Sequence, residues 1–211
     1  EAGVSRGNPR MLLTPKRLIP FLGCIFISLP ILVVVWMFGV FAPELGRALN
    51  LDGAVDAPWA LGVISLAFAL GDIASGVFSH WWGSRRKVVL TLMICMACAV
   101  VWVLSLPAGT PVIWLYVAFA ALGFFAGYWA MVALIAAEQF GTNLRATATT
   151  MVTQLVRVPM VLATTCMGVL SQTHGVVMAA WWVSLGVLAL GLLALLAVRE
   201  TADKNLDYLE K

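Results

Sequence analysis

The sequence predicts an all-α membrane protein with six transmembrane helices, and three observations lead to this prediction. Hydrophobic residues make up 62% of the 211-residue chain and charged residues only 11%, whereas a soluble domain carries roughly 25% charged residues. The apolar residues fall in six long runs, and the cations lie almost entirely in alternate connections between these runs. A soluble fold of this length would need a polar surface that the composition does not supply.

The six runs cover residues 18–41, 58–79, 88–106, 112–137, 146–170 and 176–198. Each has about the length that a helix needs to cross a ~30 Å hydrocarbon layer at ~1.5 Å per residue. Continuous apolarity excludes the alternating pattern of a barrel strand, and only helices and closed barrels satisfy their own backbone groups in hydrocarbon. The first run follows a basic stretch and lacks a small-residue cleavage site, which favours a span over a signal peptide. The longest connection is 42–56.

The distribution of cations predicts the orientation of the chain. An even number of spans places the N-terminal segment, alternate loops and the C-terminal tail on one side of the membrane. Cytoplasmic segments carry an excess of Lys and Arg, so we expect a multi-pass protein of the cell (inner) membrane with both termini in the cytoplasm. Arg47 alone lies in the opposite loops, against Arg6, Arg10, Lys16, Arg17, Arg85, Arg86, Lys87, Arg145, Arg199, Lys204 and Lys211 on the cytoplasmic side.

Three parts of the chain follow from this topology. We expect a cytoplasmic linker segment over residues 1–17, a six-helix transmembrane bundle over 18–198, and a cytoplasmic C-terminal tail over 199–211. The composition shows no other boundary and no low-complexity stretch. The lipid bilayer is therefore the first expected partner, and the net charge of +3 is no signal for nucleic acid, because the cations follow the membrane topology.

The stretch SHWWGSRRK connects the second and third runs. Tryptophan favours the headgroup level, and the three cations anchor a turn on the cytoplasmic side. Taken with the residues before it, GVFSHWWGSRRK resembles the short cytoplasmic loop of the major facilitator superfamily. Gly76, Gly83, Arg85 and Arg86 stand at the glycine and basic positions of that motif, and His80 replaces its usual acid.

A second stretch, EQFGTNLRATAT, places six residues between Glu138 and Arg145 at the cytoplasmic end of the fourth run. It is similar to the E-x6-R motif of sugar porters and related facilitators. A carboxylate and a guanidinium at a membrane edge pair with each other and with basic residues of a neighbouring loop. We therefore expect Gly83, Arg85, Arg86, Glu138 and Arg145 to form a cytoplasmic gate. The alternative is that these charges only anchor and cap helix ends.

The resemblance extends over nearly the whole chain. A third fragment, NPRMLL, is similar to the segment after the sixth helix of the same porters, and all three fragments occur in the family's order. The resemblance implies that this chain is half of a twelve-helix fold, with six spans equivalent to helices 7–12 and arranged as two inverted three-helix repeats. It also implies an N-terminal six-helix half as partner, on the same or a separate chain.

Two formal charges lie deep in the spans, Asp72 on the second and Arg157 on the fifth. Each lies roughly 18–20 Å from its cytoplasmic anchor, near the middle of the bilayer. A charge at that depth costs a few kcal/mol, so it faces a partner, a cavity or a proton path. We interpret Asp72 as a site of proton coupling and Arg157 as a contact for an anionic solute, with Gln154 one turn away sharing its partner. The alternative is a structural pair, or partners on an N-terminal half, because the family's architecture places these middle helices where the two halves meet.

The fourth run contains GFFAGYWAM, in which Gly123 and Gly127 have the spacing of close helix contacts. In this family the corresponding tenth helix lines the transport path. Phe125, Tyr128 and Trp129 are therefore candidate solute contacts, and packing is the alternative for all three.

The sequence favours secondary transport of a small polar organic solute, such as a sugar or an organic acid, with the proton as coupling ion. It contains no nucleophile, phosphate-loop or dinucleotide motif, so we expect neither an enzyme nor a cofactor. Cys95 and Cys98 lie within an apolar run without a nearby histidine, which favours packing over a metal site. The remaining alternative is a truncated or subunit-type membrane protein that assembles with a separate N-terminal half and does not transport alone.

Overall fold

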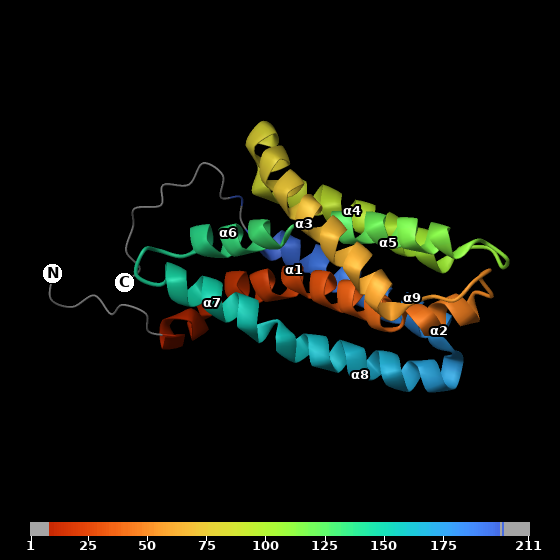
Figure 1. The fold of residues 1–211 in the computed structure, drawn as a ribbon. Coiled ribbons are helices and arrows are strands. Elements are labelled where there is room, and N and C mark those ends of the chain that lie inside the picture. Colours follow the sequence, from red (N-terminus) through yellow and green to blue (C-terminus); the bar gives the residue numbers. More distant parts are fainter. Residues whose placement is uncertain (1–8, 199, 201–211) are drawn as a thin grey trace, which may run out of the picture.

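The computed structural model describes residues 9–198 and Glu200, and this part of the chain is almost entirely helical. It contains six stretches long and apolar enough to cross a membrane, which confirms the predicted fold class. The helices run side by side, with the α6–α7 connection at one end and the α4–α5 and α8–α9 connections at the other (Figure 1). Four spans are single helices: α1 (Pro15–Val40), α3 (Ala57–Trp82), α4 (Arg85–Leu104) and α9 (Val176–Ala197).

The fourth and fifth spans are each made of two helices, which the sequence analysis did not predict. The fourth consists of α5 (Val112–Ala126) and α6 (Trp129–Gln139), and the fifth of α7 (Arg145–Leu155) and α8 (Arg157–His174). In the fifth span Pro159 has no N–H to give to the carbonyl four residues earlier, at the junction of the two helices. In the fourth, Gly127 takes a ψ of 63° and its N–H bonds Phe124 O at 3.1 Å, a tighter turn than the α-helix.

Two short helices lie outside the spans. The 3₁₀-helix η1 (Pro9–Leu13) precedes α1, and α2 (Ala42–Ala48) occupies the predicted outer loop. Asp56 closes this loop as the N-cap of α3, where its side chain accepts a hydrogen bond from Trp59 N at 3.2 Å. Of the predicted linker and tail, residues 1–8, 199 and 201–211 lie outside the described residues.

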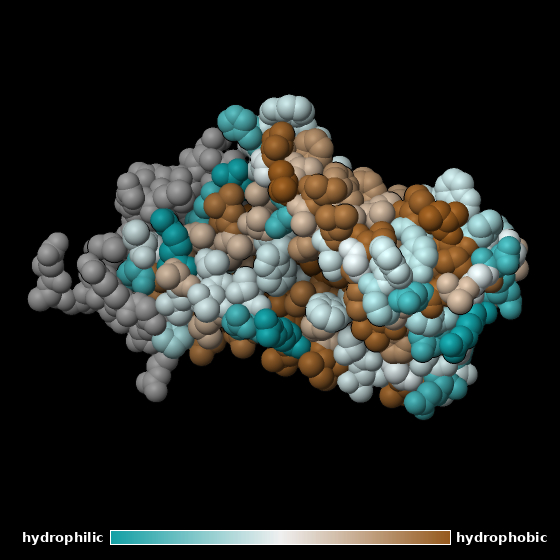
Figure 2. All heavy atoms as spheres, viewed as in Figure 1, coloured by the Kyte–Doolittle hydropathy of each residue, from teal (hydrophilic) through white to brown (hydrophobic). Residues whose placement is uncertain are grey.

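The buried core gathers around α1, which packs against α9 and contacts α3, α6, α7 and α8. Phe38 of α1 meets Phe119 of α5 edge to face, with ring centroids 6.3 Å apart. By contrast, α3 and α8 bury few side chains and expose rows of large apolar ones. Much of the middle of the visible face is accordingly apolar, and most hydrophilic residues gather toward the two ends (Figure 2).

Glycines allow α3 and α5 to approach each other at backbone distance. A Cβ added at Gly71 would overlap the carbonyl of Phe124, and one at Gly123 would overlap that of Ile64. A Cβ at Gly127 would lie 2.5 Å from the backbone N of Asp72. Small residues serve this purpose in membrane helices, where close packing replaces the hydrophobic driving force. The structure thus supports the packing interpretation for Gly123 and Gly127, and it adds Gly71 from the opposite helix.

We expect Gly71→Ala to lower the unfolding free energy of the detergent-solubilised protein by about 1–3 kcal/mol, and its melting temperature with it. The neighbouring atoms are backbone and cannot rotate away from the added Cβ. Gly62→Ala on the same helix is the matched control, since an added Cβ there has no neighbour within 4 Å. Equal melting temperatures for the two variants would show that α3 and α5 are not held at this distance.

Candidate functional site

A largely buried ion pair joins α4 to α6 at the end of the bundle where α3 meets α4. Arg85 Nη2 lies 3.2 Å from Glu138 Oε1, and Arg85 Nε lies 3.5 Å from Glu138 Oε2. The third nitrogen of the guanidinium donates to Ser79 Oγ of α3 at 2.7 Å. The Glu138 side chain is only 6% exposed and that of Arg85 22%. The pair is therefore largely withdrawn from water, where a forked arginine–carboxylate contact is directional and strong.

The turn between α3 and α4 directs Arg85 toward this pair. Gly83 ends α3 with a φ of 58°, a left-handed conformation that glycine adopts without a Cβ penalty. Ser84 is the N-cap of α4, and its hydroxyl accepts a hydrogen bond from Lys87 N at 3.2 Å. Arg85 is then the first residue of α4, and its side chain reaches back across the turn to α3 and α6.

Glu200 is a member of this cluster that the sequence analysis missed. Its carboxylate accepts hydrogen bonds from the backbone N of Arg85 at 3.0 Å and of Arg86 at 3.3 Å, and from the hydroxyl of Ser84. The first N–H groups of a helix have no partner within the helix and favour negative charge. A carboxylate just after the last span was the available signal, but nothing local in the sequence connects it with α4.

The other two basic residues of the predicted gate lie beside this pair. Arg145 begins α7, and its Nε donates to Ala137 O at the end of α6, at 3.0 Å. The side chain of Arg86 is half-buried next to Arg85. All five predicted gate residues thus lie at helix ends on the same side of the bundle, and the side chains of Arg85, Glu138 and Arg145 connect α4, α6 and α7.

Asp72 lies in the middle of α3 and its carboxylate faces the start of α6. Its Oδ1 accepts a hydrogen bond from Ala130 N at 2.9 Å. No ion pair joins Asp72 to Arg157 in the described part of the chain. The structural pair considered for these two charges is therefore not formed; the partner of Asp72 is a backbone N–H at the break in the fourth span.

Arg157 and Gln154 are exposed on the outer side of the fifth span, near the junction of α7 and α8. Over this junction a hydrophilic patch interrupts the apolar surface in Figure 2. Within residues 9–198 and Glu200, no side chain or carbonyl binds the Arg157 guanidinium. The structure thus leaves this cation exposed within the fifth span, near the junction of its two helices.

The three aromatic candidates differ in accessibility. Tyr128 is fully buried, and its hydroxyl lies 3.5 Å from Ile27 O of α1, so its side chain packs inside the bundle instead of reaching a solute path. Phe125 and Trp129, on either side of the break, are half-buried. Phe125 also meets Phe124 edge to face at 5.7 Å.

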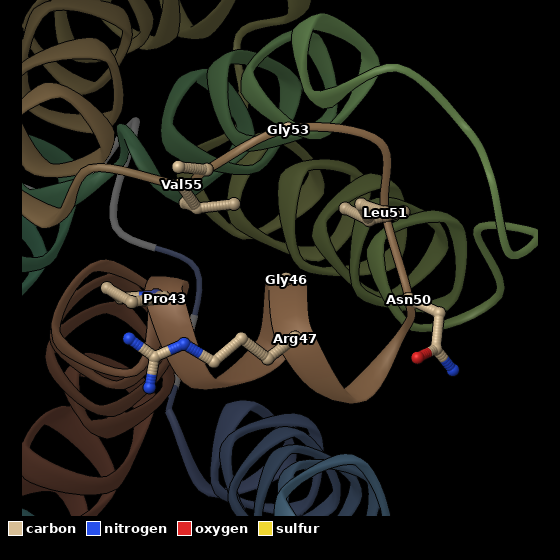
Figure 3. Close-up of a pocket in the computed structure, with 8 residues that line it drawn as sticks. Pro43, Gly46, Arg47, Asn50, Leu51, Gly53 and Val55 are labelled. Atoms are coloured by element: carbon tan, nitrogen blue, oxygen red, sulfur yellow. The ribbon is translucent and has the colours of Figure 1, made fainter.

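One cavity of about 280 Å³ lies far from all of these residues, between α2 and the loop that follows it. Figure 3 shows the side chain of Arg47 lying along α2 toward Pro43, with Asn50 at the other edge. None of the predicted proton, solute or gate residues lines it. It belongs to α2 and the loop between α2 and α3, and it offers no support for a site at Asp72 or Arg157.

The fold and the charge placement define a multi-pass membrane protein whose ionised groups concentrate at one membrane edge and at two points within the spans. Residues 4–164 match the Major Facilitator Superfamily, and the chain belongs to this family. A comparison with curated proteins gave no match. Members of this family are transporters and not enzymes, and they move small solutes across membranes. The chain is therefore a membrane transport protein, as its sequence predicts.

We expect Glu138→Gln to lower the unfolding free energy by about 1–3 kcal/mol, because the Arg85 guanidinium then loses a charged acceptor in a largely dry site. The measurement is thermal or denaturant unfolding in detergent. Glu44→Gln on exposed α2 is the control and should change stability by less than about 0.5 kcal/mol. Unchanged stability in both variants would mean that desolvation cancels the attraction within the pair.

Proposed function

We propose that this chain is the C-terminal half of a secondary active transporter that moves a small polar organic solute by alternating access in the cell (inner) membrane. Family membership supports transport in general. The observation that carries the finer proposal is a polar stripe along the exposed side of the fifth span, with Arg157 at its centre.

The stripe follows the helical repeat. Exposed positions separated by three or four residues, or by two turns, lie on one face of a helix. The polar members of this face are Thr150, Gln154, Arg157, Thr165 and Gln172, and the exposed Val161 lies among them. The neighbouring exposed face of the same span is apolar and holds Leu155, Val158, Leu162 and Val169. The fifth span therefore presents two different surfaces, one suited to hydrocarbon or apolar helices and one suited to water or a polar solute.

Arg157 favours an anionic group in the solute. A cation at mid-membrane depth needs a counter-charge or water, and no described residue binds this one. A carboxylate matches the fork of a guanidinium and binds it with two parallel hydrogen bonds. We therefore favour an organic acid or similar metabolite over a neutral sugar, with Gln154, Phe125 and Trp129 as further contacts.

Asp72 is the proposed site of proton coupling. It is the only acidic side chain deep within the described spans, and it is half-buried. Its hydrogen bond to Ala130 N engages one carboxylate oxygen, which leaves the other able to take a proton. Protonation would remove the negative charge of Asp72, whose burial costs a few kcal/mol. A proton that crosses with the solute anion would therefore lower the electrostatic barrier to moving that anion across the membrane.

The cytoplasmic cluster is the proposed gate. Arg85, Glu138 and Arg145 connect three helix ends, and Glu200 joins the start of α4 to the chain after α9. Charged hydrogen bonds of this kind form only when the helix ends converge. They would close the cytoplasmic side while the cavity opens outward, and they would break when it opens inward.

An N-terminal six-helix half is the proposed partner, on the same or a separate chain. The second and fifth spans carry the two charges within the spans, and of the described spans these two have the smallest buried shares, 22% and 17%. The same exposure supports the second candidate function, a subunit that transports only after assembly with a separate half. Purification of the transport-active species separates the two, since a second chain would copurify in the subunit case.

The orientation can be tested by cysteine labelling in intact cells. We expect Lys87→Cys, at an exposed site of the α3–α4 turn, to resist a membrane-impermeant thiol reagent, and Ala54→Cys, in the exposed outer loop, to react. Reaction only after the membrane is permeabilised places Lys87 in the cytoplasm. Labelling of Lys87→Cys from outside would invert the topology.

The solute class and the coupling can be tested on the purified transporter. A panel of sugars and carboxylates is screened by melting temperature, because a bound solute stabilises the folded state by about 2.7 kcal/mol at 100 times its dissociation constant. We expect carboxylates to raise Tm, Arg157→Gln to abolish this rise, and Arg47→Gln on exposed α2 to retain it.

In proteoliposomes, Asp72→Asn should stop uptake driven by a pH gradient and retain solute exchange. A neutral sugar that stabilises the wild type and Arg157→Gln equally would contradict the anion proposal. Full pH-driven uptake by Asp72→Asn would contradict proton coupling.

A further inference from the structure

The helix α6 is attached to the α3–α4 hairpin at both of its ends through a carboxylate. From this arrangement we propose that Asp72 is a positioning residue: its carboxylate caps α6 and holds it where Glu138 reaches Arg85. The inference rests on the proposed function only in assuming that the cytoplasmic ion pair opens and closes during transport.

The first attachment follows from the break in the fourth span. The α-helix α5 ends at Ala126, and α6 begins at Trp129. The first N–H groups of a new helix have no acceptor within it, so they need one from another part of the protein or from water. Asp72 Oδ1 accepts from Ala130 N at 2.9 Å, so a residue 58 positions away provides the cap that the local sequence lacks.

Packing fixes the acceptor at the place where it is needed. Gly127, at the break, lies directly against the backbone of Gly71 and Asp72, since a Cβ on Gly127 would stand 2.5 Å from both Gly71 C and Asp72 N. The two backbones therefore touch within one residue of the carboxylate. Asp72 is presented to the start of α6 by this contact, and its side chain has to span only a short gap.

The second attachment is the ion pair at the other end of α6. Glu138 follows Ala130 by eight residues, about 12 Å along the helix. It binds Arg85 of α4, and the same guanidinium donates to Ser79 of α3 at 2.7 Å. Since α6 has 11 residues without an interruption, a displacement of its first turn moves its last turn as well. The cap at Asp72 and the ion pair at Glu138 should therefore depend on each other.

The test measures how firmly α6 is docked, using Ala136→Cys as a buried reporter on α6. The transporter is prepared in membranes as the full chain, with its four native cysteines replaced by serine. The rate of reaction with a small thiol reagent then reports how often α6 separates from its neighbours. Ala118→Cys is the matched control reporter, because Ala118 is equally buried and lies on α5, before the break in the fourth span.

Three substitutions at Asp72 separate capping from charge. Asparagine retains an oxygen acceptor and caps helices about as well as aspartate, whereas leucine and alanine offer no acceptor. We expect Asp72→Leu and Asp72→Ala to raise the labelling rate at Ala136→Cys by about 2- to 30-fold, the range that corresponds to loss of an N-cap. Asp72→Asn should stay within about twofold of the wild type, and the rate at Ala118→Cys should not change.

A double-mutant cycle tests the coupling between the two ends. Glu138→Gln should itself accelerate labelling of Ala136→Cys, and Asp72→Leu combined with it should raise the rate by less than the product of the two single effects. Independent local contacts 12 Å apart would instead give multiplicative effects. That outcome would overturn the proposal, as would equal rates for Asp72→Asn, Asp72→Ala and Asp72→Leu.

The positioning role and the proton role fail separately. If Asp72→Asn retains both the slow labelling rate and pH-driven uptake, proton coupling is refuted and the positioning role stands. If the variants without an acceptor label as slowly as the wild type, the positioning role is refuted whatever the uptake shows. A parallel rise at Ala118→Cys would mean general loosening of the bundle and would also refute it.

Discussion

A helix that breaks inside a membrane frees backbone groups, and each of them needs a partner from the protein or from a water-filled cavity. The fourth span meets this constraint at Gly127 and Tyr128 with a carboxylate from another helix. The Asp72 oxygen takes the first-turn N–H of Ala130, and the glycines that bring α3 and α5 to backbone contact hold the two together. Without that contact the acceptor would be out of reach, and without the acceptor the second half of the span would begin with an unpaired donor. In the arrangement we propose, this hydrogen bond and the ion pair between Glu138 and Arg85 together hold α6 in position.

The N-terminus of α4 is also capped by a carboxylate from a distant part of the chain. Ser84 caps the helix locally, and the Glu200 carboxylate then takes the N–H groups of Arg85 and Arg86. In both places an acid from a distant part of the sequence satisfies a helix N-terminus, where the helix dipole favours negative charge. At α4 the cap also fixes the first residue of the helix, Arg85, which forms the ion pair with Glu138. The packing of the helix ends and the charged cluster are thus parts of one arrangement, in which backbone donors and side-chain cations share a small number of carboxylates.

The sequence predicted the spans better than it predicted their interior. Length and apolarity located all six spans, because hydrophobic thickness constrains both. The meeting of Arg85 with Glu138 was also predictable, since both residues end spans on the same side. The break at Gly127 was not, because GFFAGYWAM is as apolar as a continuous helix and hydropathy records composition, not hydrogen bonding. For the same reason the partner of Asp72 was missed: helical spacing places a side chain at a depth, but it does not say which neighbouring backbone has a free donor. Glu200 escaped notice because its contact joins residues 115 positions apart.

Asp72 and Arg157 give equivalent signals in the sequence, each a single charge near the middle of the middle helix of a triplet, yet the structure surrounds them differently. Asp72 has a hydrogen bond to the backbone and packs where two helices touch, so part of the cost of its burial is already met within this half. Arg157 stands on an exposed polar stripe, and the described chain gives its guanidinium no partner. A cation that remains uncompensated at that depth is stable only if water, the other half of the protein or a solute supplies the counter-charge. The two charges therefore differ in their partners. Asp72 is hydrogen-bonded within the helices of this chain, whereas Arg157 is exposed and faces outward from them.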